Sequence, residues 1–182
     1  KEVFQCYANR GLMYFRWGQS VASNVYFGNA KKYYEKALPF FEENKEILQN
    51  ESAIFYNNYA LFCDNQKEYN TAIELYDQAL AIKSETIGQW HISAARIYGN
   101  KALAYYNLKN YKKAIKESEQ AQRIYNANDE MYCRDALRNL GTLASSKAML
   151  KTYDEALELL FKISKIRLEK YGEDDTDVAQ TD

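Results

Sequence analysis

The sequence contains very few residues that interrupt helices. It has one proline and seven glycines in 182 residues, and alanine, leucine, lysine, glutamate and tyrosine occur throughout its length. Proline and glycine are the strongest helix breakers, whereas alanine, leucine, lysine and glutamate are good helix formers. The composition therefore predicts an all-α fold.

Charge of one sign and long hydrophobic runs are also lacking. The 24 basic and 25 acidic side chains nearly cancel, and no basic run is longer than a pair. A nucleic-acid-binding surface needs a clustered basic face, so we expect no nucleic-acid partner. No stretch reaches the roughly 18 apolar residues of a membrane span, so we expect no membrane partner either.

Cysteine and histidine are too scarce for the usual metal or catalytic sites. The three cysteines, Cys6, Cys63 and Cys133, are odd in number and widely spaced, which indicates free thiols and favours a cytoplasmic location. The single histidine, His91, has no partner for metal binding or acid–base work, and we expect it to lie in a loop or to cap a helix. Without a glycine-rich phosphate loop or a nucleophile motif, the sequence predicts no enzyme activity, no catalytic residue, no metal and no cofactor.

One pattern occurs four times with a constant period, since each copy begins 42 positions after the one before it. An aromatic residue is followed three positions later by an alanine, in the pairs Phe27 and Ala30, Tyr69 and Ala72, Tyr111 and Ala114, and Tyr153 and Ala156. A second set of small residues has the same period: Gly18, Ala60, Ala102 and Ala144. A fixed period of this length indicates stacked structural repeats. Small residues at recurring places predict that two antiparallel helices cross closely there.

The repeat also predicts where helices begin and end. Repeat two should form helices over 51–65 and from 69 to 84 or 86, with a turn at 66–68, and the matching turns should lie at 108–110 and 150–152. In repeat one, the first helix should begin near Glu2 and break at Ser23–Asn24, and Pro39 should kink or end the second helix.

Four repeats account for almost the whole chain. Their approximate bounds are 11–52, 53–94, 95–136 and 137–178, and a fifth repeat would open at 179–182. We therefore expect a single solenoid over 1–182. Because a last helix without a cap exposes an apolar face, we also expect the native chain to continue past Asp182. The start at Lys1 likewise suggests a piece of a longer protein.

These residues resemble tetratricopeptide repeats. Repeat two supplies the family's aromatic and small positions with Tyr56, Ala60, Cys63, Tyr69, Ala72, Tyr76 and Ala79. The 42-residue length is similar to the repeats of kinesin light chains and their bacterial relatives. The resemblance implies a right-handed superhelical solenoid of antiparallel helix pairs with four repeats. It also implies a non-enzymatic module that binds a protein or peptide in a concave groove.

The family's groove positions can be carried over residue by residue. They give the predicted peptide-binding set Asn58, Leu61, Asn65, Arg96, Asn100, Leu103, Asn107 and Arg138, and further groove positions that include Leu12, Ile54, Gly99 and Thr142. Asn58 and Asn65 are seven positions apart, and so are Asn100 and Asn107. Seven positions are two helical turns, so the two residues of each pair lie on the same helix face. Asparagine amides suit a peptide backbone, and arginines suit a ligand carboxylate. In the alternative interpretation, the asparagines lie on a solvent-exposed helix face and the arginines form ion pairs with neighbouring acidic residues.

The family's carboxylate clamp is incomplete in this sequence. Phe15 and Gln19 stand where lysine and asparagine are wanted, and Asn100 stands where a second basic residue is expected. An acidic chaperone C-terminus is therefore not the expected ligand, and a partner helix or an internal peptide segment fits better. Two other functions stay open. One is a sensing or gating regulatory arm of a longer signalling protein or peptidase, whose partner is another domain of the same chain. The other is an assembly scaffold that self-associates through its ends.

Overall fold

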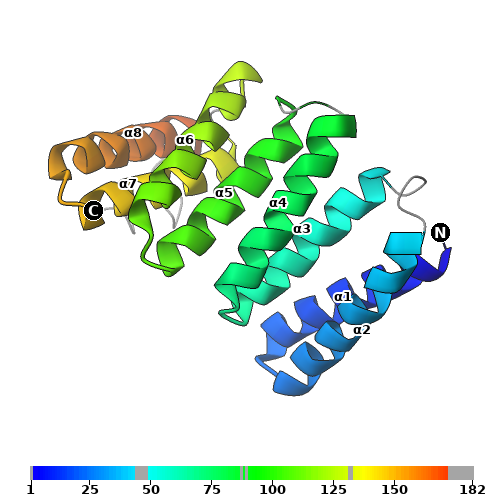
Figure 1. Cartoon of the computed structure of the whole chain (residues 1–182). Coiled ribbons are helices and arrows are strands. Elements are labelled where there is room, and N and C mark those ends of the chain that lie inside the picture. Colours follow the sequence, from blue (N-terminus) through cyan, green and yellow to red (C-terminus); the bar gives the residue numbers. More distant parts are fainter. Residues whose placement is uncertain (1, 44–48, 87, 89, 131–132, 172–182) are drawn as a thin grey trace. The chain divides into compact units, whose positions relative to one another are not determined.

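The computed structural model describes residues 2–43, 49–86, 88, 90–130 and 133–171, and these form helices and short turns only (Figure 1). The helices are α1 (Glu2–Val21), α2 (Asn24–Glu43), α3 (Gln49–Asn65), α4 (Tyr69–Thr86), α5 (Ile92–Asn107), α6 (Tyr111–Ala127), α7 (Arg134–Met149) and α8 (Tyr153–Tyr171). The all-α fold is therefore confirmed. The expected opening of a fifth repeat at 179–182 lies outside the described residues.

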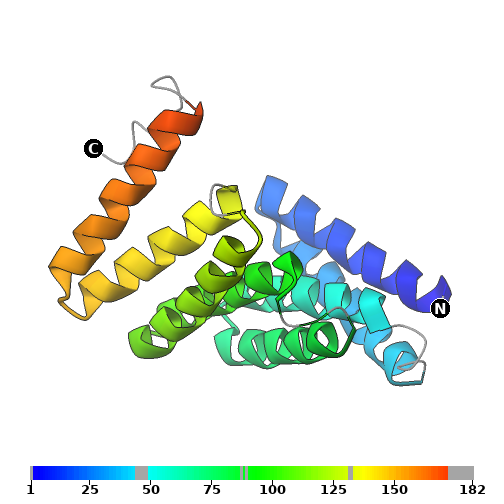
Figure 2. The same ribbon diagram turned by 90° about the horizontal axis from the view of Figure 1, so that it is seen from above.

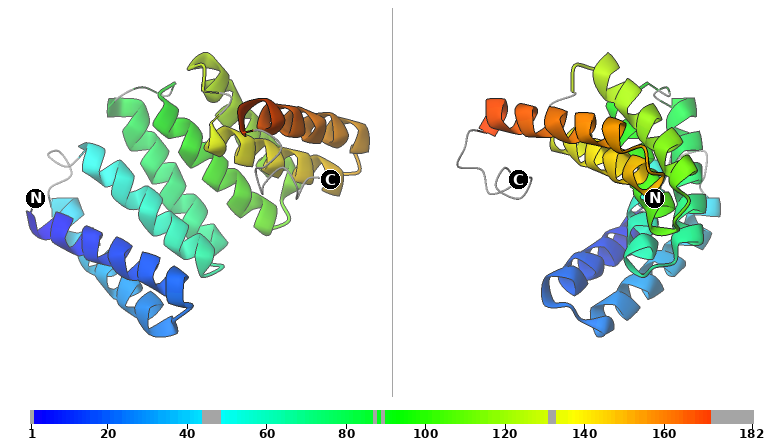
Figure 3. Two further views of the ribbon diagram at one scale, coloured as in Figure 1. Left: turned by 180° about the vertical axis from the view of Figure 1, so that it is seen from behind. Right: turned by 90° about the vertical axis from the view of Figure 1, so that its left-hand side faces the viewer.

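The chain divides into two compact units, Lys1–Gln89 and Trp90–Asp182. In the first unit, α1 packs against α2 and α3 packs against α4, while α3 also contacts α1 and α2. In the second unit, α5 packs against α6, and α7 contacts α5, α6 and α8. Figure 2 shows α7 and α8 joined at one end by a short turn, and Figure 3 shows α3 and α4 lying side by side along their length. Each repeat is thus one helix pair. A single solenoid over 1–182 stays a prediction.

The small residues of the repeat lie at the crossings of these pairs. All eight are buried: Gly18, Ala60, Ala102 and Ala144 on the first helices, and Ala30, Ala72, Ala114 and Ala156 on the second helices. Close-packed interiors leave no room for a longer side chain at such a contact. The predicted close crossing of the two helices is therefore confirmed in every repeat.

The turns inside repeats two, three and four share one geometry. Lys67, Lys109 and Lys151, which hold the same place in successive repeats, adopt left-handed backbone conformations with φ of 63°, 60° and 64°. In the first of them, the Lys67 N–H donates to the Asp64 carbonyl at 2.9 Å and the Glu68 N–H donates to the Cys63 carbonyl at 2.8 Å. This pair of bonds is the Schellman motif, which satisfies the last carbonyls of a helix. The turns predicted at 66–68, 108–110 and 150–152 are confirmed.

Repeat one departs from this geometry, and its break lies one residue earlier than the expected Ser23–Asn24. Its first helix ends at Val21, so the break lies at Ala22–Ser23 and α2 already begins at Asn24. The reason is that Ala22, with φ of 49°, takes the left-handed conformation three positions earlier than the lysines do in the other repeats. The expectation that Pro39 ends α2 is wrong, because α2 continues to Glu43, and a kink at Pro39 stays a prediction. Pro39 is exposed and removes only its own backbone donor, on a side of the helix that water reaches.

A glycine-to-alanine change at the crossing of α1 and α2 should be costly. A Cβ atom at Gly18 would lie 2.7 Å from two ring carbons of Phe27, closer than real contacts allow. We expect Gly18→Ala to lower the free energy of unfolding by about 1–3 kcal/mol, because the ring has to move out of a packed site. Chemical denaturation followed by circular dichroism measures this change.

Gly28→Ala is the matched control for that experiment. Gly28 lies within α2, and no atom comes within 4 Å of a Cβ placed there. Alanine is the better helix former, so we expect this variant to gain about 0.5–1 kcal/mol. Equal effects of the two substitutions would contradict the close approach of the helices at Gly18.

Candidate functional site

His91 and Cys133 start the first helices of repeats three and four. The backbone N–H of Ser93 donates to Nδ1 of His91 at 3.2 Å, so His91 is the N-cap of α5. The N–H of Ala136 donates to Sγ of Cys133 at 3.4 Å, so Cys133 is the N-cap of α7. The expectation that His91 caps a helix is confirmed. The sequence analysis did not predict the cap at Cys133. Cys133 holds the same repeat position as His91, and that correspondence could have predicted it.

Metal ligands do not gather in the described part of the chain. There, no three side chains of the histidine, cysteine, aspartate or glutamate type lie close enough together to hold a metal ion. The cysteines of this part of the chain are free thiols, and burial raises the pKa of Cys63 to about 12. None of the helices described here is long and apolar enough to cross a membrane.

In the first unit, the three predicted groove residues of α3 lie in different surroundings. Asn58 is half-buried and lines a pocket, and Leu61 is half-buried outside that pocket. Asn65 is exposed at the end of α3, where its Oδ1 accepts a hydrogen bond from Nε2 of Gln66 at 2.9 Å. The structure therefore joins Asn58, but not Leu61 or Asn65, to a pocket.

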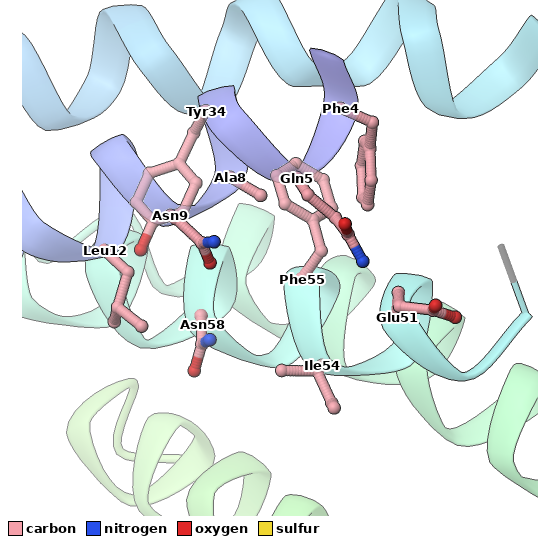
Figure 4. Close-up of a pocket in the computed structure, with 10 residues that line it drawn as sticks. All are labelled: Phe4, Gln5, Ala8, Asn9, Leu12, Tyr34, Glu51, Ile54, Phe55 and Asn58. Atoms are coloured by element: carbon pink, nitrogen blue, oxygen red, sulfur yellow. The ribbon is translucent and has the colours of Figure 1, made fainter. Parts of the chain in front are cut away.

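This pocket, which we call the α1–α3 pocket, has a volume of about 310 Å³ (Figure 4). Its lining residues are Phe4, Gln5, Ala8, Asn9, Leu12, Tyr34, Glu51, Ile54, Phe55 and Asn58. Leu12, Ile54 and Asn58 are groove positions carried over from the family pattern. The other lining residues were not predicted from the sequence, because they meet only where α1, α2 and α3 pack together.

In the second unit, Asp135 holds both predicted arginines. Nε of Arg96 donates to Oδ2 of Asp135 at 2.7 Å, and Nη2 of Arg138 donates to Oδ1 of the same carboxylate at 3.2 Å. Arg138 also donates to Oδ1 of Asn100 at 3.2 Å. The arginines thus pair with a neighbouring acid, as the alternative interpretation expected. Sequence reasoning missed Asp135, although it lies three positions before Arg138 on the same helix.

The same residues surround a small hollow of about 10 Å³, with room for about one water molecule. It is lined by Arg96, Gly99, Asn100, Leu103, Tyr125, Asp135, Arg138, Asn139 and Thr142. Four of the predicted peptide-binding residues therefore meet: Arg96, Asn100, Leu103 and Arg138. Asn107 is exposed at the end of α5 and does not line the hollow.

Arg96, Arg138, Asp135, Asn100 and Tyr125, which we call the arginine cluster, lie at two depths around this hollow, a buried floor and an exposed rim. Asn100 is 6% exposed and Tyr125 is 2% exposed, so both lie in the floor. Burial raises the pKa of the Tyr125 hydroxyl, with a further contribution from Asp135, so the hydroxyl stays protonated. Both arginine side chains are 59% exposed at the rim. Two guanidiniums and one carboxylate leave the cluster with a net charge of about +1, because arginine is always protonated.

Comparison with known proteins places the chain among repeat structures. Residues 51–127 match the family model described as tetratricopeptide repeat. No curated protein matches the chain. The fold is similar to the crystal structure of a Podosopora anserina protein described as a kinesin light chain with nearly identical TPR-like repeats. That similarity has 18% identity and a TM-score of 0.77, and it covers 94% of this chain and 80% of that chain.

Two further crystal structures are similar. A substituted variant of the Podosopora anserina protein is 17% identical, with a TM-score of 0.82 over 100% of this chain and 83% of that chain. BtubC (BKLC) from P. vanneervenii is 16% identical, with a TM-score of 0.64 over 99% of this chain and 79% of that chain. At such identities the likeness shows the fold. It confirms the predicted all-α solenoid class, built of antiparallel helix pairs.

Proposed function

Because residues 51–127 match the tetratricopeptide repeat model and the fold is similar to that of TPR-like repeat structures, we propose that the chain is a non-enzymatic protein–protein interaction module. It binds a peptide or a partner helix on the groove-lining faces of its first helices, without a cofactor. Repeats of this kind bury their hydrophobic faces against one another and use the surface that they line together for binding. The exposed guanidiniums of Arg96 and Arg138 at the rim of one hollow are the observation that carries the proposal.

The arginine cluster favours an acidic group on the partner. Each guanidinium has five N–H donors, and the carboxylate of Asp135 engages one nitrogen of each. The remaining donors can bind a ligand carboxylate or peptide carbonyls. Charge-assisted hydrogen bonds of this type are strong and directional. Asn100 positions Arg138 for the ligand, because its buried amide oxygen accepts a hydrogen bond from the Arg138 guanidinium.

A pull-down from native lysate with identification of the captured proteins tests the proposal. We expect Arg138→Ala to lower the capture of a specific partner about tenfold or more, because a charge-assisted contact is lost. Asp135→Asn should strengthen capture, because it removes the carboxylate that competes with the ligand for both arginines. The double variant Asn58→Ala/Asn100→Ala should lose the partner as well, while its helicity stays unchanged.

Arg123→Ala serves as the control. Arg123 is an exposed arginine of α6 that does not line the hollow, so its loss changes the net charge equally without touching the cluster. Equal capture by wild type, Arg138→Ala and Asn58→Ala/Asn100→Ala would move the interface away from the groove positions and overturn the proposal. Loss in Arg123→Ala alone would do the same.

A further inference from the structure

The outer face of α8 carries exposed apolar side chains. Within the second unit, α8 packs against α7 and against no other described helix, whereas α6, the corresponding helix of repeat three, contacts both α5 and α7. The buried face of α8 joins the core through Ile163 and Ile166. On the opposite face, Phe161 is 73% exposed and Leu168 is 47% exposed. Exposed apolar side chains that gather on one face mark interaction sites.

Comparison of the repeats shows that these two residues are peculiar to repeat four. An acidic residue holds the place of Phe161 in every earlier repeat: Glu35, Asp77 and Glu119. The place of Leu168 holds Asn126 in repeat three. Glu119 and Asn126 are exposed although the next repeat packs against α6 through α7. A further repeat stacked in the same way would therefore leave Phe161 and Leu168 in water, so a different kind of partner is needed to cover them.

Four positions of this face have the spacing of a two-helix contact. Leu157, Phe161, Ser164 and Leu168 follow one another at intervals of four, three and four, which is the alternation of the d and a positions of a heptad. Leu157 is 51% exposed, and Ser164 is half-buried. Ser164 is the small side chain of the four, so it leaves room for a large side chain on a helix that packs against it.

A second copy of α8 fits this face when it runs antiparallel. With a two-fold axis at the middle of the four positions, Phe161 lies opposite Ser164 of the second copy, and Leu157 lies opposite Leu168. A large residue then meets a small one, as close packing requires. A parallel pair would instead place two Phe161 rings against each other and two Ser164 side chains together, so one layer would be crowded and the next would be underfilled.

Charge complementarity supports the antiparallel arrangement. Glu158 and Lys165 are exposed and seven positions apart, so they lie on the same edge of this face, one toward each end of the helix. In an antiparallel pair this edge meets the same edge of the other helix, so Glu158 of each copy lies near Lys165 of the other. Nζ of Lys165 lies 3.9 Å from Oε1 of Glu169 in its own helix, and both side chains are largely exposed. Such a contact is weak and does not prevent Lys165 from pairing across the dimer.

We propose that two copies of the chain dimerise through an antiparallel pair of α8 helices, with Leu157, Phe161 and Leu168 in the contact and Glu158 paired with Lys165 at its edge. This surface is separate from the groove-lining faces of the first helices, so the inference does not depend on the proposed function. A single helix pair is smaller than a standard interface, so we expect a dissociation constant of about 1–100 µM.

The mass of the chain in solution tests the dimer. In sedimentation equilibrium over concentrations that bracket this dissociation constant, we expect the mass to rise from 21.3 kDa toward twice that value. Phe161→Glu/Leu168→Asn introduces the residues that repeat three carries at these places. It should raise the dissociation constant about a hundredfold or more, because each copy loses two apolar contacts. Its circular dichroism should match wild type, since both positions are exposed.

Val25→Glu is the matched control. Val25 is an apolar residue of α2 that is 72% exposed, so the substitution removes a similar exposed side chain and adds the same charge away from α8. We expect the dissociation constant to stay within about twofold of wild type, because surface changes outside a contact have small effects.

Charge reversal tests the orientation of the two helices. Glu158→Lys alone should raise the dissociation constant about three- to tenfold, because two lysines then face each other across the contact. Lys165→Glu alone should do the same with two glutamates. The double variant Glu158→Lys/Lys165→Glu should restore the dissociation constant of wild type, because it exchanges both charges of each pair.

Three outcomes would overturn the inference. A chain that stays monomeric would leave the outer face of α8 to a different protein or to a segment outside the described residues. A dimer that persists in Phe161→Glu/Leu168→Asn, or that is lost in Val25→Glu, would place the contact elsewhere. A charge-exchanged double variant that dimerises no better than the single variants would contradict the antiparallel arrangement.

Discussion

Ala72→Arg is expected to unfold the second repeat. Ala72 is 0% exposed at the crossing of α3 and α4, where its methyl group fills the contact between the two helices. An arginine there either forces the helices apart or buries a guanidinium without a counter-charge, and both are costly. We expect a loss of about 4 kcal/mol or more, which is a large part of the roughly 5–15 kcal/mol that stabilises a typical domain. Far-UV circular dichroism should show a much lower melting temperature and less helix.

The matched control is the same substitution on the exposed side of the same helix. Ala81 lies in α4 and is exposed, so Ala81→Arg adds an identical side chain into water. We expect a change within about 0.5 kcal/mol, because arginine is a good helix former. A melting midpoint for Ala72→Arg that matches wild type would show that the repeat register, and with it the assignment of helix faces, is wrong.

Loss of the carboxylate that pairs with Lys101 should have the second-largest effect. Nζ of Lys101 on α5 lies 3.1 Å from Oε1 of Glu117 on α6, and the side chains are only 9% and 14% exposed. Glu117→Gln leaves the ammonium largely buried without this counter-charge, and removing one partner of a buried ion pair costs about 3 kcal/mol or more. Chemical denaturation should show this as a lower midpoint.

A double variant separates the ion pair from simple packing. Lys101→Met/Glu117→Met replaces both charges with apolar side chains of similar length, and we expect it to be far more stable than Glu117→Gln. The exposed pair of Lys31 and Glu68, with 3.3 Å between Nζ and Oε1, provides the comparison. Glu68→Gln should cost less than about 1 kcal/mol, because solvent screens that pair. If both single variants cost the same, burial does not govern the strength of the Lys101–Glu117 pair.

The sequence by itself determined the helical content, the repeat and most helix boundaries. These features depend on neighbours along the chain: the scarcity of proline and glycine, the small residues at a constant period, and turns such as that at Lys67. The Schellman turn involves only residues within one turn of the helix end, so it recurs wherever the local sequence recurs. Even so, the local pattern misplaced the break in repeat one, because Ala22 takes the left-handed conformation there.

The tertiary structure alone decided which groove positions act together. Asn58 and Asn100 hold the same place in their repeats, yet Asn58 lines a pocket and Asn100 is buried as an acceptor for Arg138. The bridge through Asp135 depends on contacts between helices that are separate along the chain. The repeat pattern specifies which face of a helix is buried. The side chains that meet across two packed helices depend on helix crossings and on residue sizes that differ from one repeat to the next.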